Sequence, residues 1–222
     1  MDTQGEHLKN LKEIRSIMER SSRFLSLSGL SGIFAGIVAL VGALAVYVYQ
    51  RDFFCGRYLH QGVLLRDDML AGRELYGFLV FIFIDAFLVL TLALSFGVFF
   101  TTRNARKKGL PYWDKSAKRM LTNLFIPLVT GGIFCLILLY HYLIYLIAPS
   151  TLIFYGLALL NTSKFTINDI RYLGISEILL GLLAMFFVGY GLILWAIGFG
   201  FLHIIYGFAM YWKYERFAGK SE

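Results

Sequence analysis

Four long stretches of this chain contain almost no charged residues, and they dominate its hydrophobic pattern. They cover residues 24–50, 75–102, 120–163 and 178–212. A helix that crosses a bilayer needs about 20 predominantly apolar residues, so the first two stretches each hold one helix and the longer last two each hold two. The pattern therefore predicts six membrane-spanning helices.

These helices are predicted to form one all-α transmembrane bundle over residues 25–214. The expected spans cover residues 25–49, 76–100, 121–140, 143–161, 175–197 and 199–214. Only Gly198-Phe199-Gly200 separates the last two, which predicts a tight turn there. An amphipathic helix over residues 1–24 is expected before the bundle, because its apolar residues recur on one helical face, and residues 215–222 form a short tail.

The basic residues predict the orientation of the bundle. Of the 21 Lys and Arg residues, the expected outer segments hold only Arg51, Arg57, Arg66 and Arg73. Because cytoplasmic segments of membrane proteins are enriched in Lys and Arg, both termini are predicted to be cytoplasmic, in a bacterial inner membrane. The net charge of +7 then reflects orientation, and no nucleic-acid partner is expected.

Basic residues are densest in the loop between the second and third spans. Because Lys and Arg at this level attract anionic headgroups, the loop is predicted to contact lipid. The residues expected to do so are Arg103, Arg106, Lys107, Lys108, Lys115, Lys118 and Arg119.

Asp85 is the leading candidate for a functional residue, because it interrupts the second span near mid-depth. A carboxylate there costs about 3 kcal/mol, so we expect it to face the bundle and either accept hydrogen bonds or stay protonated. The partners expected from depth are Thr130, His203 and Tyr206. A structural hydrogen bond and a role with a proton, ion or ligand both remain open.

Small residues form a stripe on the first span. Gly32 and Gly36 make a GxxxG pair, a spacing that lets two helix backbones approach closely. The stripe therefore predicts packing against another helix.

No catalytic motif points to an enzyme, so no catalytic residue is assigned. Gly29-Leu30-Ser31-Gly32 matches the short GxSG string of rhomboid proteases, but Ser31 and His203 are expected near opposite membrane faces, too far apart for a nucleophile and its base. His60, His141 and His203 raise the question of a metal or haem, yet their spacing matches no ligand motif. Neither a metal nor a cofactor is expected.

Four segments resemble an uncharacterised family of small six-span bacterial membrane proteins, found mostly in Bacteroidota. The resemblance lies in IRSIMERSSRFLSLSGLSG (residues 14–32), LIFYGLALLN (152–161), IRYLGISEILLGL (170–182) and GYGLILWAIGFGFLHIIYG (189–207). The resemblance implies a membrane location and a six-span architecture, and it supplies no catalytic residues.

The sequence therefore favours a non-enzymatic sensor, regulatory or partner-binding module, with a protein partner or a second copy of the chain left open. A small transporter or proton-coupled channel that uses Asp85 is the main alternative. An intramembrane enzyme is a further one.

Overall fold

The computed structural model describes residues 27–54, 72–107, 109, 113 and 115–216. Within these ranges the chain is helical and contains no strand, which confirms the all-α class. The predicted amphipathic helix over residues 1–24, Lys108 and the end of the tail lie outside the described residues.

Six helical rods make up the described chain. Five of them are α2 (Gly29–Phe54), α3 (Gly72–Lys107), α4 (Lys115–Tyr140), α5 (Ile147–Thr162) and α6 (Ile170–Phe186). The sixth runs over Gly191–Arg216 and is built from α7 (Gly191–Trp195), a π-helical segment η3 (Ala196–Leu202), α8 (His203–Tyr211) and a second π-helical segment η4 (Trp212–Arg216). Short 3₁₀ turns, Ile144–Leu146 and Ser163–Phe165, flank α5.

Five of the rods are long and apolar enough to cross a membrane. These spans are Gly29–Tyr49, Tyr76–Lys107, Lys115–Tyr140, Ile144–Phe165 and Gly191–Arg216. The remaining helix, α6, is shorter, at 17 residues. The length and composition of these helices indicate a membrane protein.

The turn before the last rod differs from the sequence prediction. It lies at residues 187–190, where Gly189 has a φ of 103°, whereas Gly198, Phe199 and Gly200 lie inside the continuous helix. Glycine serves two purposes in this segment: Gly189 supplies the left-handed turn conformation, and Gly198 and Gly200 supply close packing. As a result, His203 lies in the middle of a helix rather than near its outer end.

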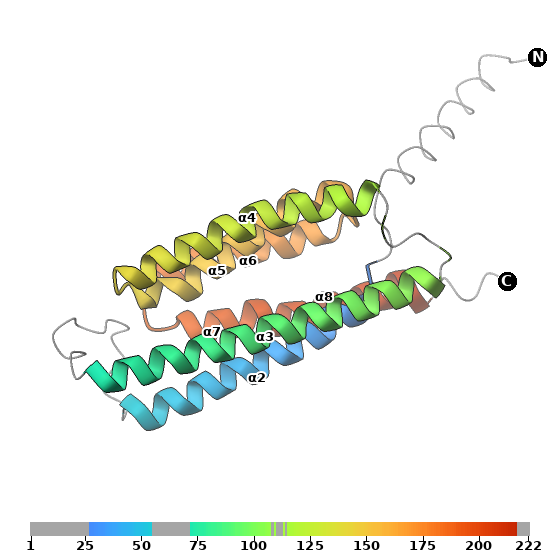
Figure 1. The fold of residues 1–222 in the computed structure, drawn as a ribbon. Helices are drawn as coiled ribbons and strands as arrows, with labels where there is room; N and C mark the ends of the chain where they lie inside the picture. Colours follow the sequence, from blue (N-terminus) through green and yellow to red (C-terminus); the bar gives the residue numbers. More distant parts are fainter. Residues whose placement is uncertain (1–26, 55–71, 108, 110–112, 114, 217–222) are drawn as a thin grey trace, which may run out of the picture.

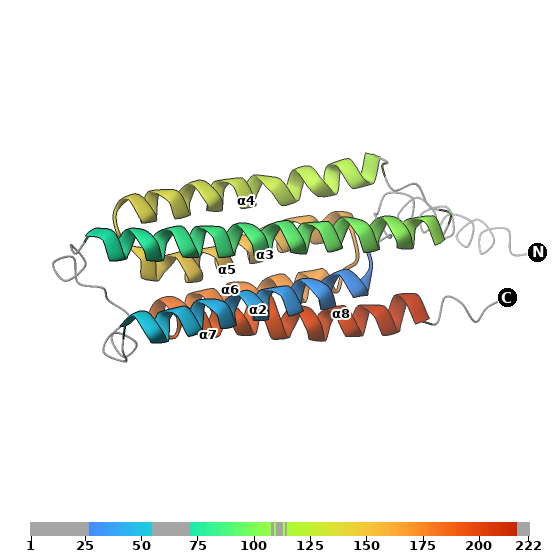
Figure 2. The ribbon, with the colours of Figure 1, turned by 60° about the horizontal axis from the view of Figure 1, so that its bottom comes forward.

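The rods form two layers, each of three helices (Figures 1 and 2). In one layer α5 packs between α4 and α6, and in the other α2 packs between α3 and the Gly191–Arg216 rod. Contacts of α5 and α6 with α7, and of α6 with η3, join the layers. Successive rods run in alternating directions, so the start of α2, the end of α3 and the start of α4 share one end of the molecule.

Polar contacts connect the helices at this end of the molecule, where α2 and α4 begin and α3 ends. The Gly29 backbone N–H donates to the Glu215 carboxylate at 2.6 Å, which joins α2 to the last rod. Lys213 and the Tyr214 hydroxyl both donate to Asp169, at 2.8 and 3.0 Å. Since Asp169 directly precedes α6, these bonds connect the two layers.

Glycines let the central helices of each layer approach closely. A Cβ at Gly36 of α2 would lie 2.6 Å from the Gly200 carbonyl oxygen, and one at Gly32 would lie 3.1 Å from the Gly207 Cα. A Cβ at Gly156 of α5 would likewise lie 2.6 Å from the Gly174 carbonyl oxygen of α6. The GxxxG pair thus faces the backbone of the last rod, as expected for this spacing.

Candidate functional site: a buried Glu–His–Tyr cluster

The Glu177 side chain of α6 is completely buried, with an exposed fraction of 0%. It lies where the two layers meet, beside Leu152 of α5 and Gly198 of η3. A Cβ at Gly198 would collide with the Glu177 carboxylate and lie 2.6 Å from Leu152 Cδ2. The absence of a side chain at Gly198 therefore makes room for this carboxylate.

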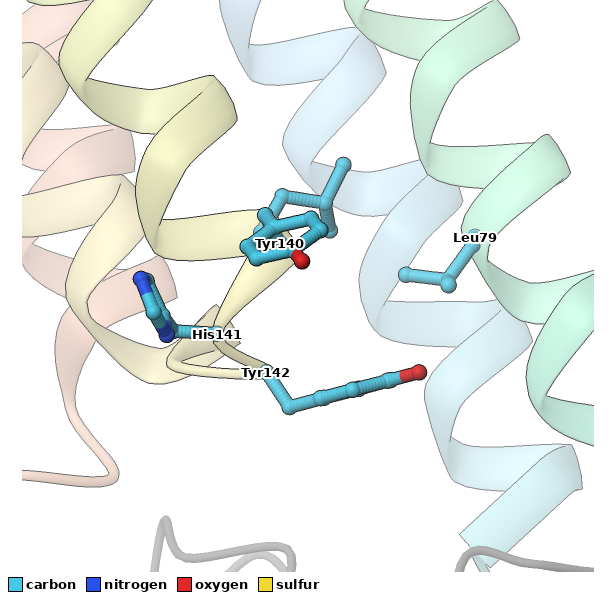
Figure 3. A pocket seen from close by; sticks show the side chains of 5 residues that line it. Leu79, Tyr140, His141 and Tyr142 are labelled. Atoms are coloured by element: carbon cyan, nitrogen blue, oxygen red, sulfur yellow. The ribbon is translucent and has the colours of Figure 1, made fainter.

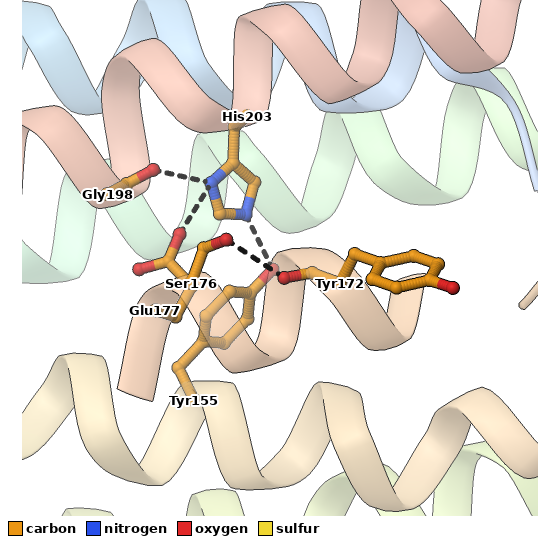
Figure 4. A network of polar contacts seen from close by, with 6 residues as sticks. All are labelled: Tyr155, Tyr172, Ser176, Glu177, Gly198 and His203. Atoms are coloured by element: carbon orange, nitrogen blue, oxygen red, sulfur yellow. Dashed lines mark hydrogen bonds and ion pairs between the residues drawn. The ribbon is translucent and has the colours of Figure 1, made fainter. Parts of the chain in front are cut away.

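The imidazole of His203 connects three helices around Glu177 (Figure 4). Its Nδ1 lies 3.0 Å from the Gly198 carbonyl oxygen and 3.4 Å from Glu177 Oε1. Its Nε2 lies 2.8 Å from the hydroxyl of Tyr155 on α5. The ring also stacks on Phe199, with centroids 5.8 Å apart. His203 is therefore fixed in position by polar contacts on both ring nitrogens.

Two arrangements of protons fit these distances. If His203 is neutral, Nδ1–H donates to the Gly198 carbonyl and Nε2 accepts from the Tyr155 hydroxyl, which leaves Glu177 protonated and beside the ring. If instead His203 carries a second proton on Nε2 and Glu177 is ionised, both ring nitrogens donate and the carboxylate faces an imidazolium 3.4 Å away. The Glu177–His203 pair has no net charge in either arrangement.

The π-helical segment explains why these groups meet. Gly198 lies five residues before His203, and the wider turn of a π-helix brings its carbonyl oxygen beside the imidazole. Such segments are rare in α-helices and often occur at functional sites. The cluster therefore coincides with a π-helical part of the last rod.

Neither oxygen of the Glu177 carboxylate has a hydrogen-bond partner among the described residues. Buried polar atoms are nearly always paired, and an unpaired one costs about 1 to 3 kcal/mol. His203 is the ionisable base that the structure places next to this carboxylate. Burial of the unpaired Glu177 carboxylate therefore lowers the stability of the folded protein.

The structure separates the residues that sequence analysis expected to find together. Asp85 is half-buried on α3, and its carboxylate oxygens lie 3.2 and 3.4 Å from where a Cβ of Gly42 on α2 would stand. Thr130 is exposed on α4 and donates to the carbonyl of Ile126 at 2.8 Å. Tyr206 packs at the core formed by Leu159, Ile170 and Leu173.

The predicted hydrogen bonds of Asp85 are therefore wrong within the described part of the chain, where none joins it to Thr130, His203 or Tyr206. Helix order explains the failure. α2 lies between α3 and the last rod, and α4 belongs to the other layer. Asp85 and its expected partners are therefore on helices that do not lie side by side, even where their depths are similar.

The sequence predicted a span over residues 175–197, which would put Glu177 at its very start. The structure begins α6 at Ile170, which carries Glu177 about two turns into the helix. Residues 166–169 have the pattern of a capping box, from Thr166 to Asp169, and a helix that starts there and continues into the apolar run would place Glu177 inside it.

The expected separation of Ser31 from His203 was also wrong. A Cβ at Gly32 would lie 3.3 Å from the His203 carbonyl oxygen, so this part of α2 packs at the same level. The side chains nevertheless have other partners: the Ser31 hydroxyl donates to the Ser28 carbonyl at 2.5 Å, and both His203 ring nitrogens are engaged. They do not form a nucleophile–base pair.

A pocket of about 480 Å³ lies apart from the cluster, where the end of α4 faces Leu79 of α3 (Figure 3). Its other lining residues are Leu139, Tyr140, His141 and Tyr142. Tyr142 has a φ of 60°, which turns the chain out of α4. Since the pocket contains none of the three cluster residues, it is a separate feature.

Among the described residues, no group of three or more His, Cys, Asp and Glu side chains is arranged to hold a metal ion. No protein-family model, curated protein or solved structure significantly matches this chain. The resemblance to a family of six-span bacterial proteins therefore stays a prediction, and functional reasoning rests on the cluster.

Proposed function

We propose that this chain is a non-enzymatic sensor or regulatory module of a bacterial inner membrane, and that it responds to protonation of the Glu177–His203 pair. The observation that supports this most is the fully buried Glu177 carboxylate, 3.4 Å from His203 Nδ1 at the contact between the layers. His is the side chain whose charge changes most readily near neutral pH.

The energetic argument concerns charge inside the bundle. An isolated charge at the centre of a membrane costs about 3 kcal/mol or more, so Glu177 and His203 favour states in which both are neutral or both are charged. Adding a proton to such a pair leaves a lone imidazolium, and removing one leaves a lone carboxylate. Because the pair joins α6 to the last rod, either event changes the contact between layers.

We expect protonation to change the separation of the layers. Spin labels at Leu182→Cys on α6 and Ile205→Cys on α8, both exposed positions, would report it in a background without the native cysteines. Their distance distribution should change between about pH 5 and about pH 8 in the parent, measured by pulsed electron resonance in lipid. The change should be smaller in Glu177→Gln, which keeps the shape of the side chain but removes one of the two ionisable groups.

Asp85→Asn is the matched control, because it removes a carboxylate on α3, outside the Glu177–His203 pair, and should leave the response intact. A pH-independent distance in the parent, or an undiminished response in Glu177→Gln, would exclude the cluster as the sensor.

Asp85 favours a proton-coupled transporter as the second candidate. Its carboxylate lies in the α2–α3 contact, in the space left by Gly42, and would give a carrier a second protonatable group. Proton uptake into liposomes, followed with an entrapped pH dye, separates the candidates. A carrier should show flux that Asp85→Asn and Glu177→Gln both reduce, whereas a sensor should show none.

The proposal includes six spans with both termini in the cytoplasm. It is supported by the alternating directions of the rods and by the side-by-side packing of α6 along α5. The 17 residues of α6 are near the lower limit for crossing a bilayer.

Reporter fusions are expected to agree with this topology. A reporter after Glu222 and one in the basic loop near Gly109 should both score as cytoplasmic, and one near Gln61 as external. A periplasmic reporter at Glu222 would instead mean that α6 does not cross.

A further inference from the structure

A groove of about 790 Å³ runs along the outer face of α4, away from the Glu177 cluster. Trp113 borders it before α4 begins, and its remaining lining comes from α4 itself. Those residues are Lys118, Leu121, Thr122, Phe125, Ile126, Val129 and Thr130.

The chemistry of the groove changes along its length. Lys118 is exposed in the first turn of α4, with Lys115 and Arg119 close by in the sequence, whereas Phe125 and Val129 further along are exposed hydrocarbon. The hydroxyls of Thr122 and Thr130 donate to carbonyls of their own helix, at 3.0 and 2.8 Å. The groove thus presents a cation at one end and a largely apolar wall beyond it.

The length of the groove fits one leaflet of a bilayer. Lys118 and Val129 are eleven residues apart, which at about 1.5 Å per residue is about 16 Å, close to half of the roughly 30 Å hydrocarbon core. Trp113 lies at the basic end, and Trp side chains favour the level of the headgroups. The direction from charge to hydrocarbon is that of a phospholipid in the leaflet at this end.

We propose that this groove binds an anionic phospholipid, with its headgroup phosphate at Lys118 and one acyl chain along Leu121, Phe125 and Val129. Charge complementarity selects this occupant, because Lys118 at the polar end favours a negative partner and the largely apolar wall beyond it favours a hydrocarbon chain. The inference is independent of the proton-sensing function.

Quenching of Trp113 fluorescence by brominated lipids tests the site. Trp195→Phe and Trp212→Phe leave Trp113 as the single tryptophan, and the protein is reconstituted in phosphatidylcholine with brominated phosphatidylglycerol or brominated phosphatidylcholine. We expect half-maximal quenching at an about fivefold lower mole fraction of the anionic lipid, the factor expected for one basic residue at an anionic surface.

Two charge variants, made in the same single-tryptophan background, locate the effect. Lys118→Gln should abolish the preference, and Arg103→Gln, which removes an exposed charge at the same end of α3, should retain it. Equal quenching by the two lipids in the parent, or an unchanged preference in Lys118→Gln, would overturn the proposal. Absence of quenching by either lipid would also overturn it, since a second copy of the chain or another protein would then cover the groove.

Discussion

A His203→Leu variant should lose about 3 to 5 kcal/mol of unfolding free energy, the usual effect of removing one member of a buried polar pair. The substitution removes the imidazole that now lies 3.4 Å from Glu177 Oε1 and 2.8 Å from the Tyr155 hydroxyl. Glu177 would remain buried, and both it and the Tyr155 hydroxyl would lie beside a leucine that can neither donate nor accept a hydrogen bond. Reversible unfolding in mixed micelles would measure the loss.

Glu177→Met provides the contrast. Methionine has a similar volume, and the neutral His203 would keep its bonds to the Gly198 carbonyl and the Tyr155 hydroxyl. Replacing a buried ionisable group by a well-packed apolar one is often neutral or stabilising by about 1 to 4 kcal/mol, so this variant should be at least as stable as the parent. If both variants were equally destabilised, Glu177 would be a structural partner of His203.

The asymmetry between these variants connects stability to function. An acid that can be replaced by methionine without loss of stability is not retained for the fold. A group that lowers stability at a buried site is instead typical of functional positions, where activity conflicts with packing. We therefore expect Glu177→Met to remain folded and to show a smaller pH response than the parent.

Hydrophobic pattern was sufficient to predict the helical class and the positions of most helices. It failed at Gly198–Gly200 because two glycines in an apolar run can form either a turn or a close helix contact, and composition is the same in both cases. The hydrophobic pattern also does not indicate that this segment is π-helical. The error displaced His203 towards the outer end of its helix and hid its contact with Gly198.

The predicted contacts of Asp85 failed for a different reason. Helices such as α3 are apolar around their whole circumference, so hydrophobic periodicity does not indicate which side faces the protein. The depth of Asp85 in the membrane could be estimated from the sequence, but the side of α3 on which it faces the protein could not. Gly32 and Gly36 were an exception, because a stripe of small residues marks the side where backbones meet.

Gly36→Leu should destabilise the protein by about 1 to 3 kcal/mol, the usual cost of overpacking. Its Cβ alone would lie 2.6 Å from the Gly200 carbonyl oxygen and 3.1 Å from the Ile204 backbone nitrogen. Backbone atoms cannot rotate away as a flexible side chain can, so α2 and the last rod would have to separate. Because Gly200 belongs to the π-helical segment, the movement should also disturb the setting of His203.

Gly97→Leu on α3 is the matched control, since a Cβ there would meet no atom within 4 Å. Both substitutions add the same side chain to the interior of a predicted span, so they differ mainly in what that side chain meets. Thermal unfolding in detergent should show a lower midpoint for Gly36→Leu and little change for Gly97→Leu. Equal midpoints would mean that α2 does not pack against the last rod through Gly36, and the support that this contact gives to the Glu177–His203 cluster would be lost.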